Sequence, residues 1–164
     1  MENFKLQIAS PFDREELVSE IWYNNDFLAE INQEKEFLEI VFYSGNQKQI
    51  TFLLEEFMEI LQTAKMNLIR DENGEIPQSK KPLFEAVKLK YVNGCHISIL
   101  KPDGKDKVTA AIFHNGELIA EINQENSLLK VTLYYNYKNI EVPIEGLQDI
   151  LQKAKDALIE NINR

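Results

Sequence analysis

Apolar residues along this chain follow two spacings, which predict two kinds of secondary structure. In much of the chain they stand at every second position, as Leu38, Ile40 and Phe42 do, and this is the period of a half-buried strand. In residues 57–68 and 147–158 they recur every three or four positions, which gives each segment one apolar stripe and predicts an amphipathic helix. We therefore expect two groups of short strands, each followed by one helix.

Two turn dipeptides fix the register expected for these strands. Asn115-Gly116 is a strong two-residue hairpin signal because both residues tolerate the positive φ of a type I′ turn, and Asn24-Asn25 holds the matching place earlier in the chain. A turn at Asn24-Asn25 sets Trp22 opposite Phe27 and predicts that both face the core together with Ala29. The residues then expected on the outward face are Ile21, Tyr23, Leu28, Val41 and Tyr43, with Ile112, His114, Ile119, Thr132 and Tyr134 later in the chain.

The chain also contains an internal repeat. Residues 29–34, Ala-Glu-Ile-Asn-Gln-Glu, return letter for letter as residues 120–125, and Ile60-Leu61-Gln62 returns as Ile150-Leu151-Gln152. A period this long indicates a duplicated domain half rather than a solenoid. The predicted fold class is therefore α+β: a tandem duplication in which each copy is an antiparallel β-meander followed by one α-helix, with a pseudo-twofold axis between the copies. The copies either share one curved sheet or pack as two adjoining lobes.

The expected organisation divides the chain into two copies and a linker. The first copy covers residues 1–72, a polar linker with glycine and proline covers residues 73–83, and the second copy covers residues 84–164. Phe84–Val92 is predicted to be an extra strand at the start of the second copy, turned back by Asn93-Gly94. The first copy would then leave a sheet edge free for a partner or for the other copy.

The negative charge of the chain lies in one half. The formal net charge is −9, and residues 1–72 contain 15 Asp and Glu against 6 Lys and Arg, whereas residues 73–164 contain 12 of each. Such a field repels nucleic-acid phosphates and anionic lipid, so we expect neither as a partner, and it attracts a basic protein. The competing interpretation is that an acidic surface only keeps the protein soluble. The outward apolar face needs a cover, which the other copy, a second subunit or a foreign partner would supply.

The sequence contains no recognisable catalytic or metal-binding set. Its two histidines, His96 and His114, are not at metal-ligand spacing, and its single cysteine, Cys95, has no partner for an internal disulfide. No nucleophile motif or phosphate-binding glycine loop is present, so we predict neither a cofactor, nor a metal, nor enzymatic activity. In one alternative, Glu30 and Glu121 form an acid/base pair in a cleft between the copies.

The expected location is the cytoplasm. The first residues lack the basic segment and the long apolar run of a secretory signal. No apolar run approaches the ~18 residues that a membrane span requires. A lone cysteine also suits a reducing compartment.

The chain resembles bacterial immunity proteins of polymorphic toxin systems. It shares with them an acidic half, the lack of a catalytic set and strand-rich units, which here contain Trp22-Tyr23, residues 29–34 and Tyr43. The resemblance implies a non-catalytic protein that binds a cognate toxin tightly and blocks its active site. That toxin would present a basic surface, as a nuclease does. The residues expected to contact it are Glu20, Tyr23, Asp26, Glu30, Glu34 and Tyr43. The alternative is a homodimeric structural or small-molecule-binding protein whose outward sheet faces pair.

Overall fold

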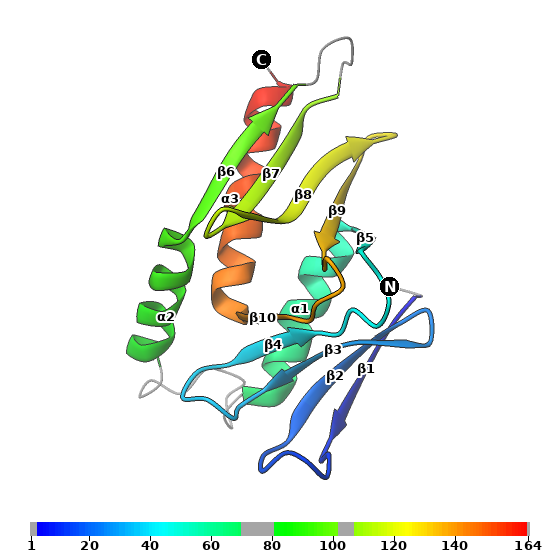
Figure 1. The fold of residues 1–164 in the computed structure, drawn as a ribbon, viewed down its shortest axis with the longest axis vertical. Helices are drawn as coiled ribbons and strands as arrows, with labels where there is room; N and C mark the ends of the chain where they lie inside the picture. The colour runs from blue at the N-terminus through cyan, green and yellow to red at the C-terminus, as the bar shows by residue number, and fades with distance from the viewer. Residues whose placement is uncertain (1–2, 70–80, 102–106, 164) are drawn as a thin grey trace.

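The computed structural model describes residues 3–69, 81–101 and 107–163, and this part of the chain is an α+β fold with three helices and two antiparallel sheets (Figure 1). Sheet A contains β1 (Phe4–Ala9), β2 (Val18–Tyr23), β3 (Asp26–Asn32), β4 (Glu39–Phe42) and β10 (Ile140–Pro143). Sheet B contains β5 (Gln49–Leu53), β6 (Cys95–Leu100), β7 (Thr109–His114), β8 (Glu117–Glu125) and β9 (Leu128–Tyr134). The strand orders are β1-β2-β3-β4-β10 and β5-β9-β8-β7-β6.

Each sheet is completed by a strand from the distant half of the chain. β5 follows β4 in the sequence, but it pairs with β9 of sheet B and sets Thr51 opposite Thr132, whose hydroxyl oxygens lie 2.7 Å apart. β10 follows β9, but it pairs with β4 of sheet A and sets Val142 opposite Ile40. The two halves of the chain are thus interlocked, an arrangement that neither a single curved sheet nor two adjoining lobes describes.

The three helices pack against these sheets and against one another. α1 (Leu54–Ile69) packs most extensively on β2 of sheet A and also reaches sheet B, and α3 (Ile144–Ile162) packs mainly on β6 and β7 of sheet B. α2 (Lys81–Asn93) lies along α3. No helix within the described ranges is long and apolar enough to span a bilayer.

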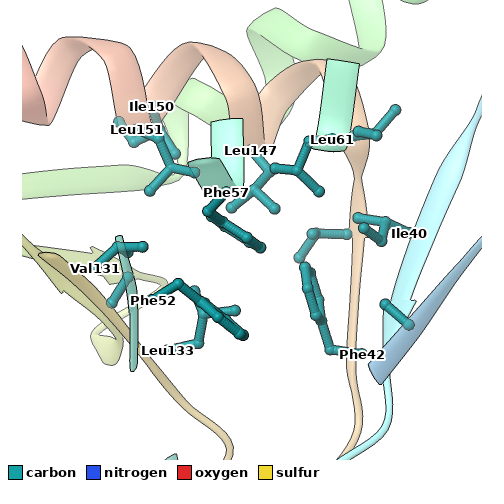
Figure 2. Packing of buried hydrophobic residues seen from close by; sticks show 14 of the residues in the cluster. Ile40, Phe42, Phe52, Phe57, Leu61, Val131, Leu133, Leu147, Ile150 and Leu151 are labelled. Carbon is teal, nitrogen blue, oxygen red and sulfur yellow. The ribbon is translucent and has the colours of Figure 1, made fainter. Parts of the chain in front are cut away.

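The buried apolar side chains form one cluster that reaches both sheets. Figure 2 shows Phe42 of β4, Phe52 of β5 and Phe57 of α1 in the same interior as Leu133 and Leu147. The rings of Phe52 and Phe57 are stacked with their centroids 4.9 Å apart. Burial of one such ring contributes about 1.5–3 kcal/mol, so the aromatic contact helps to hold β5 in sheet B against the helix that follows it.

Both predicted helices and both predicted hairpin turns are confirmed. Residues 57–68 lie within α1, and residues 147–158 lie within α3. Asn24 and Asn25 have φ values of 51° and 68°, and the Asn115-Gly116 turn has values of 49° and 82°. These are the left-handed conformations that a type I′ turn requires at both central positions.

The prediction of a strand at Phe84–Val92 is wrong, because these residues belong to α2. Phe84 and Tyr91 are buried and Val87 is half-buried, so the apolar side chains stand at helical spacings of three and four. Pro82 lies in the first turn, where its missing N–H would have no partner within the helix.

The predicted boundaries also change. Of the linker expected at residues 73–83, the last three residues begin α2, and residues 73–80 lie outside the described part of the chain. Because β5 and β10 each belong to the sheet of the other half, residues 1–72 and 84–164 share one core.

A β-bulge overturns the predicted assignment of sheet faces. Ile21 pairs with Ala29, but the register then shifts, so that Trp22 pairs with Phe27 and Leu28 is the extra residue. Ile21 and Ala29 therefore lie in the core. Trp22 and Phe27, which were expected there, lie on the opposite face, because successive side chains of a strand alternate.

The same shift occurs between Ile112 and Phe113 in β7. Ile21, Leu28 and Ile112, which were expected to face outward, are core residues, and Tyr23 packs against the core. The outward apolar face is consequently smaller than predicted. In sheet A this face keeps the aromatic residues Trp22, Phe27 and Tyr43, together with the aliphatic Val41, which stands opposite Glu30.

Candidate partner-binding site

An aromatic strip crosses the face of sheet A that lies away from the core. It consists of Trp22 of β2, Phe27 of β3 and Tyr43 at the end of β4. Trp22 and Phe27 have ring centroids 5.2 Å apart, and Phe27 and Tyr43 are stacked at 5.1 Å. All three side chains are half-buried. The bulge creates this strip, because it turns Trp22 and Phe27 away from the core.

Carboxylates flank the aromatic strip. Glu20 lies on the same face as Trp22 and accepts a hydrogen bond from its indole Nε1 at 3.3 Å. Glu30 stands directly opposite Glu20 in the neighbouring strand. Asp26 is exposed at the start of β3, beside the hairpin turn. The outer face of sheet A therefore combines flat apolar rings with acidic groups.

Glu30 is not free to meet a partner, because Arg14 covers it. Glu30 is 5% exposed, and its carboxylate accepts a hydrogen bond from the Arg14 guanidinium, which reaches over from the segment between β1 and β2. Burial acts to lower the pKa of Arg14, but the hydrogen bond and the charge of Glu30 outweigh it and raise that pKa above its usual value. The ion pair thus neutralises Glu30 within the protein.

Tyr43 shares the environment of this ion pair. Burial raises the pKa of the Tyr43 phenol, the Glu30 carboxylate raises it further, and hydrogen bonding to Arg14 partly opposes the rise. Tyr43 is therefore a neutral ring at physiological pH. The Tyr43 side chain interacts with Arg14 and Glu30, and its ring stacks on Phe27.

A pocket of about 420 Å³ opens where the β2–β3 hairpin meets the segment between β4 and β5. We call it the hairpin pocket. Its lining includes the aromatic residues Tyr23, Phe27 and Tyr43, the acid Asp26, and Asn24, Gly45 and Asn46. Asp26 carries the only charged side chain among all the residues that line this pocket. The lining thus combines three aromatic side chains, several uncharged polar residues and one negative charge.

The structure brings together some of the six residues expected to contact a partner and separates others. Tyr23, Asp26 and Tyr43 line the hairpin pocket. Glu20 lies on the adjoining sheet face. Glu34 lies apart from them in the segment after β3, where it accepts a hydrogen bond from the backbone N–H of Glu15 at 3.1 Å.

Sequence reasoning missed three residues of the site. Trp22 and Phe27 were assigned to the core, since nothing in the local sequence announces a bulge. Arg14 was not considered, because its segment contains no regular pattern that would place it over Glu30.

Glu30 and Glu121 have separate partners in separate sheets. Glu121 of β8 accepts a hydrogen bond from the Tyr134 hydroxyl at 2.7 Å. Burial and then this neighbouring carboxylate raise the pKa of Tyr134 to about 12. Glu30 is paired with Arg14 instead. Neither acid lines the hairpin pocket, so the contacts described here give no support to an acid/base dyad.

A second pocket of about 420 Å³ lies between α2 and the two sheets. Phe37, Val87, Tyr91 and Pro143 give it largely apolar walls, and His114 lies at its edge. Burial lowers the pKa of His114, which keeps its ring neutral against the stacked Tyr91 ring at 4.5 Å. Within the described residues, no three His, Cys, Asp or Glu side chains gather as metal ligands would.

Comparison of the chain with protein-family models, with curated proteins and with solved structures found no match.

Proposed function

We propose that this protein is a non-catalytic binding protein, and specifically an immunity protein that binds a cognate bacterial toxin and blocks its active site. The observation that carries the proposal is the aromatic strip of Trp22, Phe27 and Tyr43, which is half-buried and flanked by carboxylates. This strip belongs to the half of the chain that holds the whole net charge of −9. The expected partner therefore has a basic surface, as a nuclease toxin does.

The roles of the two kinds of side chain follow from general interface energetics. Large aromatic residues dominate the binding energy of protein interfaces, because they bury much area and lose little rotamer freedom. Acidic groups around them attract a basic partner at a distance and raise the association rate. We assign the anchoring role to the aromatic strip, the steering role to Glu20, Asp26 and Glu34, and a positioning role to Glu30 through Arg14.

The experiment is a capture at low salt from the native cell, with the tagged protein as bait. We expect a basic protein that elutes as the salt concentration rises, because its association depends on charge. Trp22→Ala should weaken its binding by about 30-fold, as loss of an interface hot spot does. The matched control is Phe113→Ala, which removes the ring at the same register position of sheet B.

Reconstitution with the purified partner completes the test. An immunity protein should suppress the toxic activity of that partner at a one-to-one ratio. The proposal is wrong if the partner binds Trp22→Ala as tightly as the wild-type protein, or if its bound form keeps full activity.

A small-molecule-binding function is the second candidate, and the apolar pocket beside α2 favours it. A homodimer that pairs its outer sheet faces is a third. Sedimentation velocity at low and high salt distinguishes the homodimer from the toxin complex. A homodimer that pairs through apolar rings should persist in added salt, whereas association steered by charge should weaken. The small-molecule-binding function is tested by screening a library of small apolar compounds for those that raise the midpoint of thermal unfolding.

We also infer that the chain is a tandem duplication whose copies are related by a pseudo-twofold axis. Reciprocal features support this inference: β5 joins sheet B as β10 joins sheet A, and the bulge after Ile21 recurs after Ile112. The reciprocal ion pairs between α1 and α3 join Lys65 to Glu145 and Lys155 to Glu55.

A further inference from the structure

We propose that the hairpin pocket binds a single guanidinium group, the side chain of an arginine on the partner. The inference rests on the proposed function for the source of that arginine. The pocket chemistry can be tested without the partner, because a small arginine derivative carries the same group. Three properties of the pocket lead to this ligand: the rigidity of its rings, the sign of its charge and its size.

The aromatic walls are held in place before any ligand arrives. Phe27 is stacked against Tyr43 with an angle of 30° between the rings. Tyr23 is packed between Phe4 at 4.7 Å and Phe52 at 4.8 Å. Rings that are oriented by their neighbours suit a flat cation, because a guanidinium stacks on any aromatic face that those neighbours leave open and is attracted to its negative quadrupole.

The charge of the pocket selects a cation. Asp26 is exposed and carries the only charge among the lining side chains. The nearby cation Arg14 does not oppose a second guanidinium strongly, because its charge is neutralised by the ion pair with Glu30. A carboxylate can accept two parallel hydrogen bonds from a guanidinium, which an ammonium group cannot supply in that geometry.

The size of the pocket also fits. Its volume of about 420 Å³ falls in the range of small-ligand sites. It leaves room for an arginine side chain together with the peptide groups on either side of it. Asn24 and Asn46 also line the pocket, and an asparagine side chain can accept further hydrogen bonds from such a ligand.

The chain carries its own reporter for this test. Trp22 is the only tryptophan, and its ring lies 5.2 Å from Phe27, which lines the pocket. The probe is Nα-acetyl-L-arginine amide, titrated while Trp22 fluorescence and backbone amide chemical shifts are recorded. We expect saturable binding with a Kd of about 1–10 mM, as suits one weakly held side chain. The shifted amides should be those of Tyr23, Asp26 and Gly45.

Two comparison ligands separate charge from shape. The matching citrulline derivative has nearly the same shape without the charge, and it should bind at least about fivefold more weakly. The lysine derivative has the charge without the flat fork and should fall between the two. Citrulline binding as tight as that of arginine would overturn the proposal.

A matched pair of variants locates the site. Asp26→Asn should weaken binding of the arginine derivative by about fivefold and leave the fold intact, because Asp26 is exposed. Glu117→Gln, the exposed acid at the same place in the β7–β8 hairpin, should have no effect. Equal losses in both variants would mean that net charge alone attracts the ligand, and the proposed site would be rejected.

The outcome is independent of partner capture. If the arginine derivative fails to bind while the basic partner is captured and Trp22→Ala weakens its binding, the pocket inference fails and the proposed function stands. If the derivative binds as expected but no basic partner is captured, the proposed function fails and the pocket remains a guanidinium site.

Discussion

Lys65 of α1 donates a hydrogen bond to Glu145 of α3 at 3.0 Å and another to the Gln148 side chain at 2.9 Å. Lys65 is 5% exposed, so its ammonium group depends on these partners. We predict that Glu145→Ala lowers the free energy of unfolding by about 2 kcal/mol, because it leaves a buried charge without its counter-ion. Urea denaturation followed by circular dichroism measures the loss.

The control for this prediction is the reciprocal ion pair. Lys155 pairs with Glu55 at 2.5 Å, but the Glu55 side chain is 65% exposed. Glu55→Ala should therefore cost less than about 0.5 kcal/mol, as exposed pairs do. Equal losses in the two variants would show that burial does not distinguish the pairs.

The Arg14–Glu30 pair allows a prediction on both stability and titration. Arg14→Ala should destabilise the fold by about 1 kcal/mol, because Glu30 loses its ion pair but gains access to water where the Arg14 side chain covered it. It should also raise the pKa of Tyr43, since Arg14 acts to lower that pKa, whereas Glu30→Gln should lower it. Carbon-13 resonances of the tyrosine rings, followed from neutral to alkaline pH, report both shifts. Shifts of the same sign in the two variants would contradict the assignment.

Gly146 of α3 has no room for a side chain. A Cβ atom there would lie 2.5 Å from Cδ1 and 2.9 Å from Cβ of Tyr91 in α2. We predict that Gly146→Ala destabilises the protein by about 1–3 kcal/mol, despite the preference of helices for alanine. The double variant Gly146→Ala/Tyr91→Leu should recover part of that loss in the same denaturation measurement. No recovery would mean that the clash lies elsewhere.

Within the described residues, the buried hydroxyl of Tyr91 makes no hydrogen bond of ordinary geometry, and it interacts only with the weakly polar Cys95 thiol. Tyr91→Phe removes only this group, so its stability should equal or exceed that of the wild-type protein. This variant separates the packing of the Tyr91 ring from the effect of its polar end.

The two hairpin turns should respond in opposite ways to substitution. Asn25→Gly should stabilise the protein by about 0.5 kcal/mol, because glycine adopts a φ of 68° without steric cost. Gly116→Ala should destabilise it by about 1 kcal/mol, because alanine would be forced to a φ of 82°. Thermal midpoints of both variants decide the matter, and a stabilising Gly116→Ala would contradict the assigned turn.

Stability should fall at alkaline pH, and Cys95 should begin the fall. Burial raises the pKa of the Cys95 thiol to about 11, against about 8.5 in an unfolded chain. A folded pKa above the unfolded one gives stability that is complete below about pH 8.5 and is lost as pH rises through 11. The free energy of unfolding should therefore be flat to about pH 8.5 and then decline.

The Cys95→Ala variant provides the control. Its decline should begin later, when tyrosines such as Tyr134, with a pKa raised from 10.0 to about 12, start to ionise in the unfolded state. Alkylation of Cys95 at pH 8 should also be about a hundredfold slower in the folded protein than in urea, since the thiolate is the reactive form. Equal alkylation rates would show that the thiol is not protected.

Local patterns predicted the elements of this fold better than their pairing. The stripes within α1 and α3 and the asparagine turns depend on neighbouring residues, so the sequence alone was sufficient for them. The spacing of Phe84, Val87 and Tyr91 also carried a helical signal, but the Asn93-Gly94 turn led to the wrong prediction of a hairpin strand. The exchange of β5 and β10 between the sheets cannot be read from the local sequence. A strand shows the same alternation of apolar and polar residues whichever strand it pairs with.

The sequence predicted only part of the candidate site. Asp26, Tyr23 and Tyr43 were expected to contact a partner, and they line one pocket. Trp22 and Phe27 were assigned to the wrong face, because one extra residue at Leu28 reverses every side chain beyond it. Glu30 kept its expected position in the sheet, but its exposure depended on Arg14, sixteen residues earlier in the chain.

The exchange of strands has a consequence for synthesis. The only neighbour of β5 in its sheet is β9, which leaves the ribosome roughly 80 residues later, a delay of about 4–16 s at ordinary rates of translation. Until then β5 carries an unpaired edge, and Phe52 has nowhere to be buried on the side of sheet B. During this interval the nascent first half has an unpaired strand edge and an incomplete core. The chain is therefore most prone to aggregation before its second half is synthesised.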